Sequence, residues 1–163
     1  MQDLKQFARG SRWRDKIKVV LLSSGFSAVF LIRIQSFLYE SNWLILSYWI
    51  HRLNLNQHGI DVLPGSIIDG GLHIEHPVGI VIGSQVKIGK NATILQGVTL
   101  GSSNVLENNL HIKQPKIGDN VVIGANSSIL GPITIGNNAR IGAHSLVLYS
   151  LPDGARFPNP RFD

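Results

Sequence analysis

The sequence predicts a solenoid of short β-strands, preceded by a helical region. In two blocks, residues 82–100 and 117–147, an aliphatic residue returns at every sixth position, as at Ile117, Ile123 and Ile129. Four positions after most of these comes a second small or aliphatic residue, and a glycine directly follows many of them. Neither a helix nor an alternating strand has a six-residue period. Each hexapeptide is therefore expected to form one strand and one turn, and the repeated side chains to stack into a continuous core.

Length and composition limit the alternatives. At 163 residues the chain is long enough for one domain, or for a repeat array with a small appendage. It has no cysteine, which excludes disulfides, thiolate metal ligands and a thiol nucleophile. Residues 1–52 contain eight Lys or Arg and three acidic residues, whereas residues 53–163 contain seven of each. The net charge of +5 therefore lies in the first third, and the neutral repeats lack the basic stripe of a nucleic-acid site.

Residues 1–54 are expected to form the helical region, because they contain two glycines and no proline. Ser11, Ser24 and Ser41 are plausible caps. The longest uncharged run, 19–32, has fourteen residues, fewer than the roughly 20 that a membrane-spanning helix needs. A secretory signal is disfavoured because no small-residue cleavage site follows this run before Arg33. The predicted helical segments are 3–9, 12–23, 26–39 and 42–53.

The apolar side chains of this region, among them Phe26, Phe30, Trp43 and Trp49, have two interpretations. They can pack on the end of the solenoid and on neighbouring subunits, where they would cover an otherwise open edge. They can also attach the chain to an anionic membrane surface, together with the basic residues of segment 9–18. Both interpretations stay open, because they can use different faces. The expected location is the cytoplasm, with or without contact to the inner face of a membrane.

The solenoid is expected to span residues 55–151, and its first break lies at His76. The register runs through Ile74 but resumes at Ile82, so that the phase slips by two residues around His76-Pro77. A break in a strict repeat is where function is expected to override local consistency. Histidine is suited to accepting a proton near neutral pH, and Asp61, one coil earlier, could hold its imidazole. The alternatives are a structural histidine, or a metal site formed by His73, Glu75 and His76.

A second break follows Leu100, where residues 102–116 carry no repeat signal. Such a stretch must leave the coil as an excursion loop, and long loops on rigid scaffolds often carry binding residues. His111, Lys113 and Gln114, near its end, could face the same site as His76. A solvated loop that packs on a neighbour is the alternative. Residues 152–163, after the solenoid, are expected to form a C-terminal tail.

Three motifs add a resemblance to a known family. They are His-Pro-Val-Gly-Ile-Val-Ile-Gly at 76–83, Gln-Gly-Val-Thr-Leu-Gly at 96–101 and Pro-Lys-Ile-Gly-Asp-Asn-Val-Val-Ile-Gly-Ala at 115–125. In order and spacing they resemble the serine acetyltransferase family, over about residues 55–150. The resemblance implies a left-handed parallel β-helix with three hexapeptides per coil, and a homotrimer with active sites between adjacent subunits. It also implies acetyl-CoA as co-substrate, and no metal is expected.

The resemblance also assigns residues. The catalytic histidine falls on His76 and its orienting aspartate on Asp61, while Ala125 and Ala143 match positions whose backbone lines the CoA arm. The acceptor side departs from the family, since Glu75 replaces an aspartate, Lys113 an arginine and Gln114 a histidine. Backbone amides near Gly101 would stabilise the oxyanion. The candidate cations for the CoA phosphates are Lys116, Arg140, Arg156 and Arg161.

The expected activity is acetyl-CoA-dependent O-acetylation, with His76 as general base. The changes at Glu75 and Gln114 weaken the fit to free serine, and the basic, aromatic helical region favours work at a membrane. The acceptor predicted first is therefore a sugar of a surface polysaccharide or exopolysaccharide. Serine, as in cysteine biosynthesis, is the alternative acceptor. A trimeric scaffold protein without catalytic activity is the non-enzymatic alternative.

Overall fold

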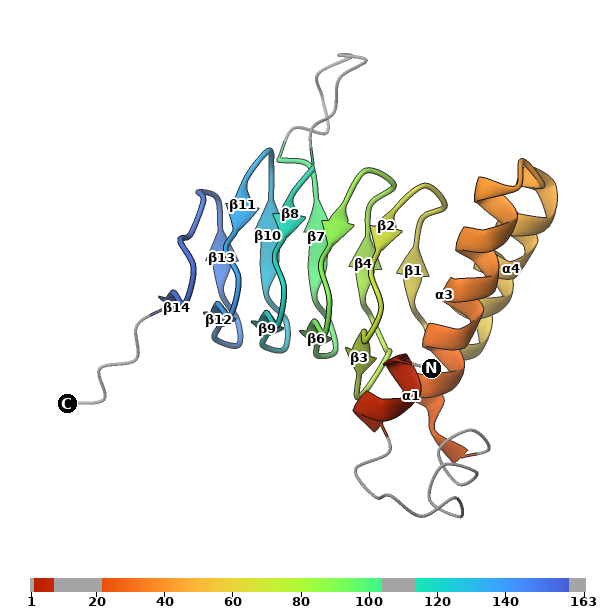
Figure 1. The fold of residues 1–163 in the computed structure, drawn as a ribbon, viewed down its shortest axis with the longest axis horizontal. Coiled ribbons are helices and arrows are strands. Elements are labelled where there is room, and N and C mark those ends of the chain that lie inside the picture. The colour runs from red at the N-terminus through yellow and green to blue at the C-terminus, as the bar shows by residue number, and fades with distance from the viewer. Residues whose placement is uncertain (1, 8–21, 104–113, 159–163) are drawn as a thin grey trace.

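The computed structural model describes residues 2–7, 22–103 and 114–158, and within them three helices precede a parallel β-helix (Figure 1). The helices are α1 (Gln2–Phe7), α3 (Ser24–Glu40) and α4 (Leu44–His58). The predicted segments 26–39 and 42–53 correspond to α3 and α4, and most of 12–23 lies outside the described residues. The strands are β1 (Asp61–Val62), β2 (Ile67–Ile68), β3 (His73–Ile74), β4 (Val81–Ile82), β5 (Lys87–Ile88), β6 (Thr93–Ile94), β7 (Thr99–Gly101), β8 (Lys116–Ile117), β9 (Val122–Ile123), β10 (Ser128–Leu130), β11 (Thr134–Ile135), β12 (Arg140–Ile141), β13 (Leu146–Val147) and β14 (Arg156–Phe157).

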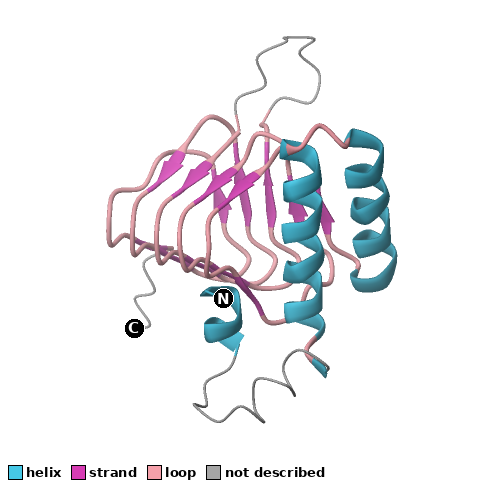
Figure 2. Ribbon diagram, turned by 45° about the vertical axis from the view of Figure 1, so that its right-hand side comes forward, coloured by secondary structure: helices cyan, strands magenta, loops and turns pink. Residues whose placement is uncertain are grey.

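From β1 to β13 every third strand belongs to the same parallel sheet, so that three strands make one coil (Figure 2). Sheet A contains β1, β4, β7, β10 and β13, and sheet B contains β2, β5, β8 and β11. Sheet C contains β3, β6, β9, β12 and β14. The connections between these sheets form three edges of a prism, here named edges AB, BC and CA after the sheets they join. The predicted architecture of stacked hexapeptide coils is confirmed.

The repeated aliphatic residues form the core. In each regular two-residue strand the second residue points inward and the first outward, so that Ile82, Ile94 and Ile123 are fully buried. Two serines take inward positions in the later coils, and each hydroxyl donates a hydrogen bond to the carbonyl of Gly142, from Ser127 at 2.8 Å and Ser145 at 2.7 Å. These bonds satisfy polar groups that burial would otherwise penalise.

The predicted phase slip is present in the first coil. Asp61 pairs with Val81, twenty positions on, whereas Val81 pairs with Thr99, eighteen positions on. The two extra residues lie in the connection from β3 to β4, which has six residues, 75–80, where the next connection, 83–86, has four. This six-residue connection is named the wide corner below. Because the strands on either side keep their inward residues, the extra length is confined to edge CA.

The helical region covers the first coil, as the packing interpretation predicts. Ala28, Val29 and Ile32 of α3 are buried in the same core cluster as the strands. The side-chain amide of Gln35 donates to the carbonyl of Val62 at 2.8 Å, which ties α3 to β1. Helix α4 in turn packs on α3 through a buried serine, whose hydroxyl donates to the Gln35 carbonyl at 2.9 Å. The open end of the solenoid is therefore closed by α3.

The helix ends differ from the predicted ones. The N-cap of α3 is Ser23, whose hydroxyl accepts from the amide of Phe26 at 3.1 Å, and Ser24 is the first helical residue. Ser41 caps the C-terminus of α3 and does not start α4. The prediction for Ser24 is one residue off, because the adjacent serine offers the same cap chemistry, whereas Ser41 is a helix cap as predicted. Helix α4 continues to His58, past the predicted boundary at 54, and ends where Gly59 adopts φ 67°.

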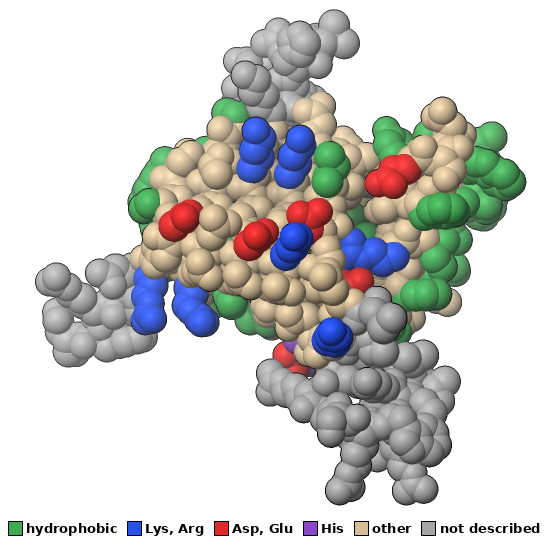
Figure 3. Space-filling model, viewed as in Figure 1, with side chains coloured by type: hydrophobic (Ala, Val, Ile, Leu, Met, Phe, Trp, Pro, Cys, Tyr) green, Lys and Arg blue, Asp and Glu red, His purple; other side chains and the backbone are tan. Residues whose placement is uncertain are grey.

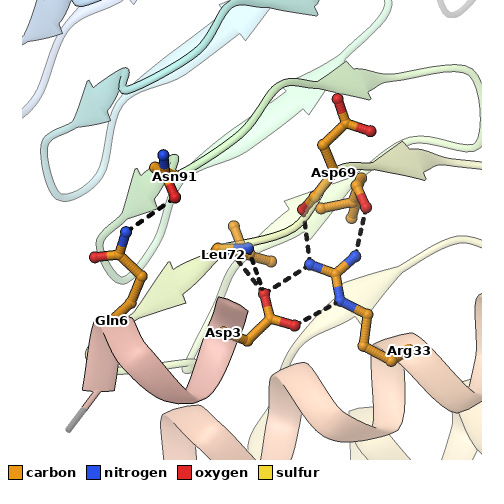
Figure 4. Close-up of polar contacts among 8 residues, drawn as sticks. Asp3, Gln6, Arg33, Asp69, Leu72 and Asn91 are labelled. Carbon is orange, nitrogen blue, oxygen red and sulfur yellow. Dashed lines mark hydrogen bonds and ion pairs between the residues drawn. The ribbon is translucent and has the colours of Figure 1, made fainter. Parts of the chain in front are cut away.

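Helix α1 is held on the first coil by a partly buried ion pair (Figure 4). The guanidinium of Arg33 donates to both carboxylate oxygens of Asp3 at 2.9 Å and also reaches the carbonyls of Ile68 and Asp69. One oxygen of Asp3 accepts from the amides of residues 71 and 72 at 2.8 and 2.9 Å. Burial alone raises the pKa of Asp3, but the hydrogen bond and charge of Arg33, with these two amides, outweigh it and lower that pKa.

Helix α4 presents an unusual surface. Its buried residues are the polar Ser47 and Asn54, while large apolar side chains gather on the outside of the helical layer (Figure 3). None of the described helices combines the length and apolar character needed to cross a membrane. The exposed apolar residues of α4 and its N-cap are Trp43, Leu44, Ile45, Leu46, Tyr48, Trp49, Leu53 and Leu55.

The C-terminal tail begins as part of the solenoid. Arg156 and Phe157 of β14 pair with β12 in sheet C, and Phe157 packs partly buried against the core. The strand thus extends sheet C into the segment predicted as a tail, 152–163. The candidate Arg161 lies outside the described residues.

Candidate active site

Edge CA brings together several of the predicted site residues. A ladder of backbone bonds runs along it: the amide of Gly97 donates to Val78 at 3.0 Å, and that of His144 to Ala125 at 2.8 Å. Between them the amide of residue 126 donates to residue 96 at 2.9 Å. The wide corner with His76, and the later corners with Ala125 and Ala143, are therefore stacked on one edge of the prism.

The wide corner exposes its ionisable side chains. Glu75 and His76 are exposed, while Pro77 and Ile80 are buried beneath them. The Glu75 carboxylate lies 3.4 Å from Nε2 of His73, so that it has a partner on its own strand. Because the corner is held from below by buried residues, the His76 imidazole is presented to solvent on a fixed backbone.

Asp61 lies beside the wide corner, but its hydrogen bond goes to another histidine. The Asp61 amide donates to the Ile80 carbonyl at 2.8 Å, which places β1 next to the end of this corner. The Oδ1 atom of Asp61 is 2.8 Å from Nε2 of His51, on α4. In the described part of the chain no hydrogen bond joins Asp61 to His76. The predicted pairing of Asp61 with His76 stays a prediction, and His51 is a neighbour that the repeat pattern gave no signal for.

Gln114 and Gly101 lie on a different edge. Gly101 ends β7 at edge AB, where its carbonyl accepts from the amide of residue 131 at 2.9 Å. The Oε1 atom of Gln114 accepts from the amide of Gln85 at 2.9 Å, on the same edge. Its side chain fills the space above Gly83, where an added Cβ would lie 2.2 Å from Oε1. His111 and Lys113, from the same excursion loop, lie outside the described residues.

The candidate cations do not converge within one chain. Lys116 lies on sheet B, paired with Lys87 across neighbouring strands. Arg140 lies on sheet C, paired with Arg156. The two pairs are exposed on separate faces, and like charges opposite one another repel unless an anion or solvent screens them. Within the described ranges, no group of three or more His, Asp or Glu side chains is arranged to hold a metal ion.

Comparison with known proteins identifies relatives with this architecture. The family model described as bacterial transferase hexapeptide (six repeats) matches residues 114–148, and the hexapeptide repeat of succinyl-transferase matches 79–114. The serine acetyltransferase of Staphylococcus epidermidis is 40% identical over 151 residues, which cover 92% of this chain and 70% of that protein. That of Helicobacter pylori strain J99 is 37% identical over 142 residues, or 87% of this chain and 81% of that protein.

The chain belongs to the serine acetyltransferase family. A solved structure of the Neisseria gonorrhoeae serine acetyltransferase in complex with serine is 38% identical, with a TM-score of 0.83, over 95% of this chain and 63% of that one. Isoform 3 from Entamoeba histolytica, in complex with cysteine, is 28% identical, with a TM-score of 0.85, over 99% and 57%. The chain thus spans about three fifths of the length of these solved serine acetyltransferases.

Membership in the serine acetyltransferase family confirms four predictions. These are the family itself, the left-handed parallel β-helix with a helical N-terminal region, the class of acyltransferase enzymes, and acetyl-CoA as the family's co-substrate. The comparisons do not support a saccharide acceptor or membrane contact, and they favour serine, which the sequence interpretation ranked second.

Proposed function

We propose that this chain transfers the acetyl group of acetyl-CoA to the hydroxyl of serine. The observation that carries the proposal is the match, over 95% of the chain, to a family structure holding serine. A 40% identical relative named serine acetyltransferase supports it further. The acceptor ranked first from the sequence, a polysaccharide sugar, is thereby replaced by serine as the main proposal.

In this proposal His76 takes the proton from the serine hydroxyl as the hydroxyl oxygen attacks the thioester carbonyl. The carbonyl becomes a tetrahedral oxyanion. Backbone amides near Gly101 of a neighbouring subunit would stabilise it, because Gly101 lies on edge AB and His76 on edge CA. Collapse of this intermediate expels the CoA thiolate, and the proton on His76 passes to it. Asp61 would stabilise the imidazolium of His76. What supports these roles is the exposed imidazole on the wide corner, with β1 alongside.

The donor side is proposed along edge CA. Ala125 and Ala143 lie on the same edge as His76 and present little side-chain bulk, so that an extended pantetheine arm could lie against their backbone. The phosphates of acetyl-CoA would need cations at the far end of this arm. Arg140 lies on sheet C, which borders edge CA, whereas Lys116 lies on sheet B, which does not. We therefore rank Arg140 above Lys116 for this role.

The acceptor side is proposed to need a second copy of the chain. Gln114 lies on edge AB and His76 on edge CA, so that sheet A separates them within one chain. A site that uses both residues must lie between neighbouring subunits, with Gln114 of one subunit near the wide corner of the next. This agrees with the expected homotrimer. Glu75, Lys113 and Gln114 would then be the acceptor-binding residues.

A saccharide hydroxyl remains the second candidate acceptor, for one structural reason. The Gln114 side chain is bonded to the amide of Gln85, and the Glu75 carboxylate is paired with His73. The engaged atoms are Oε1 of Gln114 and Oε2 of Glu75, and these contacts leave fewer acceptors for the ammonium of serine, a group that a neutral sugar lacks. Membrane contact and a cytoplasmic location also stay predictions. The exposed apolar face of α4 supports membrane contact, and flotation with anionic vesicles would test it.

Thiol release distinguishes the two acceptors. The chain is incubated with acetyl-CoA and either serine or a panel of polysaccharide oligomers, and free CoA thiol is followed with time. We expect rapid release with serine, and acetylserine as the product by mass spectrometry. Release that depends on an oligosaccharide and not on serine would transfer the proposal to the second acceptor. Absence of release with every acceptor, together with absence of CoA binding by calorimetry, would favour the scaffold alternative.

A further inference from the structure

We infer that His51 is a positioning residue for the reaction, which holds the Asp61 carboxylate in the orientation needed beside His76. The inference rests on the proposed function, because Asp61 and His76 are its proposed catalytic pair. Its basis is the 2.8 Å contact between Nε2 of His51 and Oδ1 of Asp61, which joins α4 to the first strand of the solenoid.

The contact is built on the buried side of Asp61. The side chain of His51 is 12% exposed, while that of Asp61 is 38% exposed. The ring of Tyr48 meets the His51 ring edge-on, at 6.4 Å between centroids and an interplanar angle of 87°, and so restricts its rotation. A nearly buried imidazole thus anchors one oxygen of a carboxylate that remains partly open to solvent.

The anchor leaves the other carboxylate oxygen available. Among the residues that the structure describes, the side-chain hydrogen bond of Asp61 is made through Oδ1, and Oδ2 has none. The backbone of Asp61 is fixed beside the wide corner by its bond to Ile80. With both the backbone and Oδ1 held, rotation of the carboxylate is restricted, and Oδ2 is the atom left to accept from a neighbouring imidazole. Pre-orientation of this kind is what a second layer of hydrogen bonds supplies in active sites.

The inference gives the helical layer a part in catalysis. The repeat coils alone position Asp61 and His76, but the His51 anchor comes from α4. His51 does not touch substrate in this assignment and acts only through Asp61. Its removal should therefore change the turnover number and leave the affinity for both substrates unchanged.

Three variants test the assignment. His51→Leu removes the hydrogen bond, and His51→Gln keeps a side-chain N–H donor at similar reach. His58→Leu is the matched control, since His58 also lies on α4 but contacts Ser27, at 3.2 Å, and not Asp61. We expect His51→Leu to lower kcat about tenfold, the effect of one hydrogen bond to a charged group, with KM for acetyl-CoA and serine unchanged. His51→Gln should recover most of kcat, and His58→Leu should keep it.

A double-mutant cycle separates positioning from a general loss of structure. In an Asp61→Asn background, His51→Leu should cause little further loss, because its effect passes through Asp61. An equal loss in both backgrounds, or an unchanged kcat in His51→Leu, would overturn the inference. Urea unfolding of each variant identifies those that fail to fold. If His51→Leu fails to fold, His51→Gln replaces it in the cycle and is judged by the same criteria.

A measurement that does not require turnover tests the role of His51 separately from the proposed function. Nitrogen-15 NMR of the imidazoles reports the tautomer of His76 whether or not an acceptor is known. Asp61→Asn and His51→Leu should both shift His76 toward a mixture of tautomers. If Asp61→Asn has this effect and His51→Leu does not, the inference fails. If neither acceptor class supports turnover but both shifts occur, the proposed function fails and the positioning by His51 stands.

Discussion

His76 lies exposed on a corner that is two residues longer than the regular one. In the four-residue connections the chain turns directly from one sheet to the next, and its last residue enters the core. The wide corner keeps that feature in the fully buried Ile80 but adds length before it, so that Glu75 and His76 stand outside the coil. A side chain meant to meet substrate needs this exposure on a rigid frame.

Replacement of His76 by alanine tests its role as general base. We expect turnover to fall by about 10²–10⁴-fold, the typical contribution of a positioned acid or base. Binding of CoA should change little, because the donor arm is proposed to lie along Ala125 and Ala143. Thiol release measures the first quantity and calorimetry the second. Retained turnover in His76→Ala would remove His76 from the mechanism.

At the scale of elements, α1 depends on a few polar contacts. Asp3 joins α1 to Arg33 of α3 and to the backbone amides of the first coil (Figure 4). The pKa of Asp3 is lowered in the folded chain, since its charged form is stabilised by Arg33 and these amides in spite of burial. This stabilisation is present above the ordinary pKa of 3.8 and is lost as the pH falls through the lower folded value.

Replacement of Asp3 by asparagine should reproduce the effect of low pH at neutral pH. We expect Asp3→Asn to lower the free energy of unfolding by about 1–2 kcal/mol at pH 7, and the difference from wild type to vanish below the folded pKa. Urea unfolding between pH 2.5 and 7 measures this. Amide exchange at Gly71 and Leu72 should rise in the variant. Asp69→Asn is the control, since Asp69 contributes only its carbonyl; a difference independent of pH would contradict the assignment.

The corners between strands are a second feature at this scale. Two of their glycines show separately why a side chain is unfavourable there: lack of space at one, and backbone conformation at the other. An added Cβ at Gly124 would lie 2.5 Å from the backbone nitrogen of Ala143, which cannot move without separating the coils. At Gly154 nothing lies within 4 Å, but the backbone has φ 70°, which is unfavourable for other residues. The first position is restricted by packing and the second by the left-handed conformation.

Alanine at these two positions should therefore destabilise to different extents. We expect Gly154→Ala to lower the free energy of unfolding by about 1–2 kcal/mol, the strain of a left-handed residue. Gly124→Ala should lower it by about 3 kcal/mol or more, because a backbone clash has no rotamer that relieves it. It should also weaken CoA binding, because Gly124 precedes Ala125 on edge CA. Equal losses of stability would show that the coils can separate at this corner.

At the scale of the whole molecule, the two breaks in the repeat point to different edges of the prism. Sheet A lies between the wide corner on edge CA and the end of the excursion loop on edge AB (Figure 2). Residues of sheet A, including Val81 and Leu146, expose apolar side chains outward. The two halves of the proposed site therefore face different directions in a single chain, with sheet A between them. Threefold assembly would bring one half against the other.

Light scattering tests the assembly. We expect a mass of three times the 17.9 kDa of the chain, and a leucine-to-glutamate change at Leu146 should release monomers without loss of the β-helix by circular dichroism. Turnover should fall together with the trimer, because the site is proposed to lie between neighbouring subunits. A monomer with full activity would contradict the shared site.

The sequence by itself determined the solenoid, its core residues and both breaks in register. It could do so because each coil repeats the same local rule: an inward aliphatic residue, a turn, and the next strand at a fixed distance. Ala125 and Ala143 hold equivalent positions, eighteen residues apart, in successive coils, so that the repeat alone stacks them. The repeat does not specify which side chain meets which across a coil, or how a helix from outside the repeat lies on it.

The tertiary structure decided what lies next to Asp61. Residue spacing suggested His76, whereas the packing of α4 on the first coil brings His51 to Oδ1. Likewise Gln114 was expected to face His76, and the fold places the two on different edges of the chain. Both outcomes depend on contacts between segments that share no periodicity. The burial of α3 and the direction in which each corner points determine these contacts. Such contacts are a property of the folded assembly of coils and helices, and no local pattern encodes them.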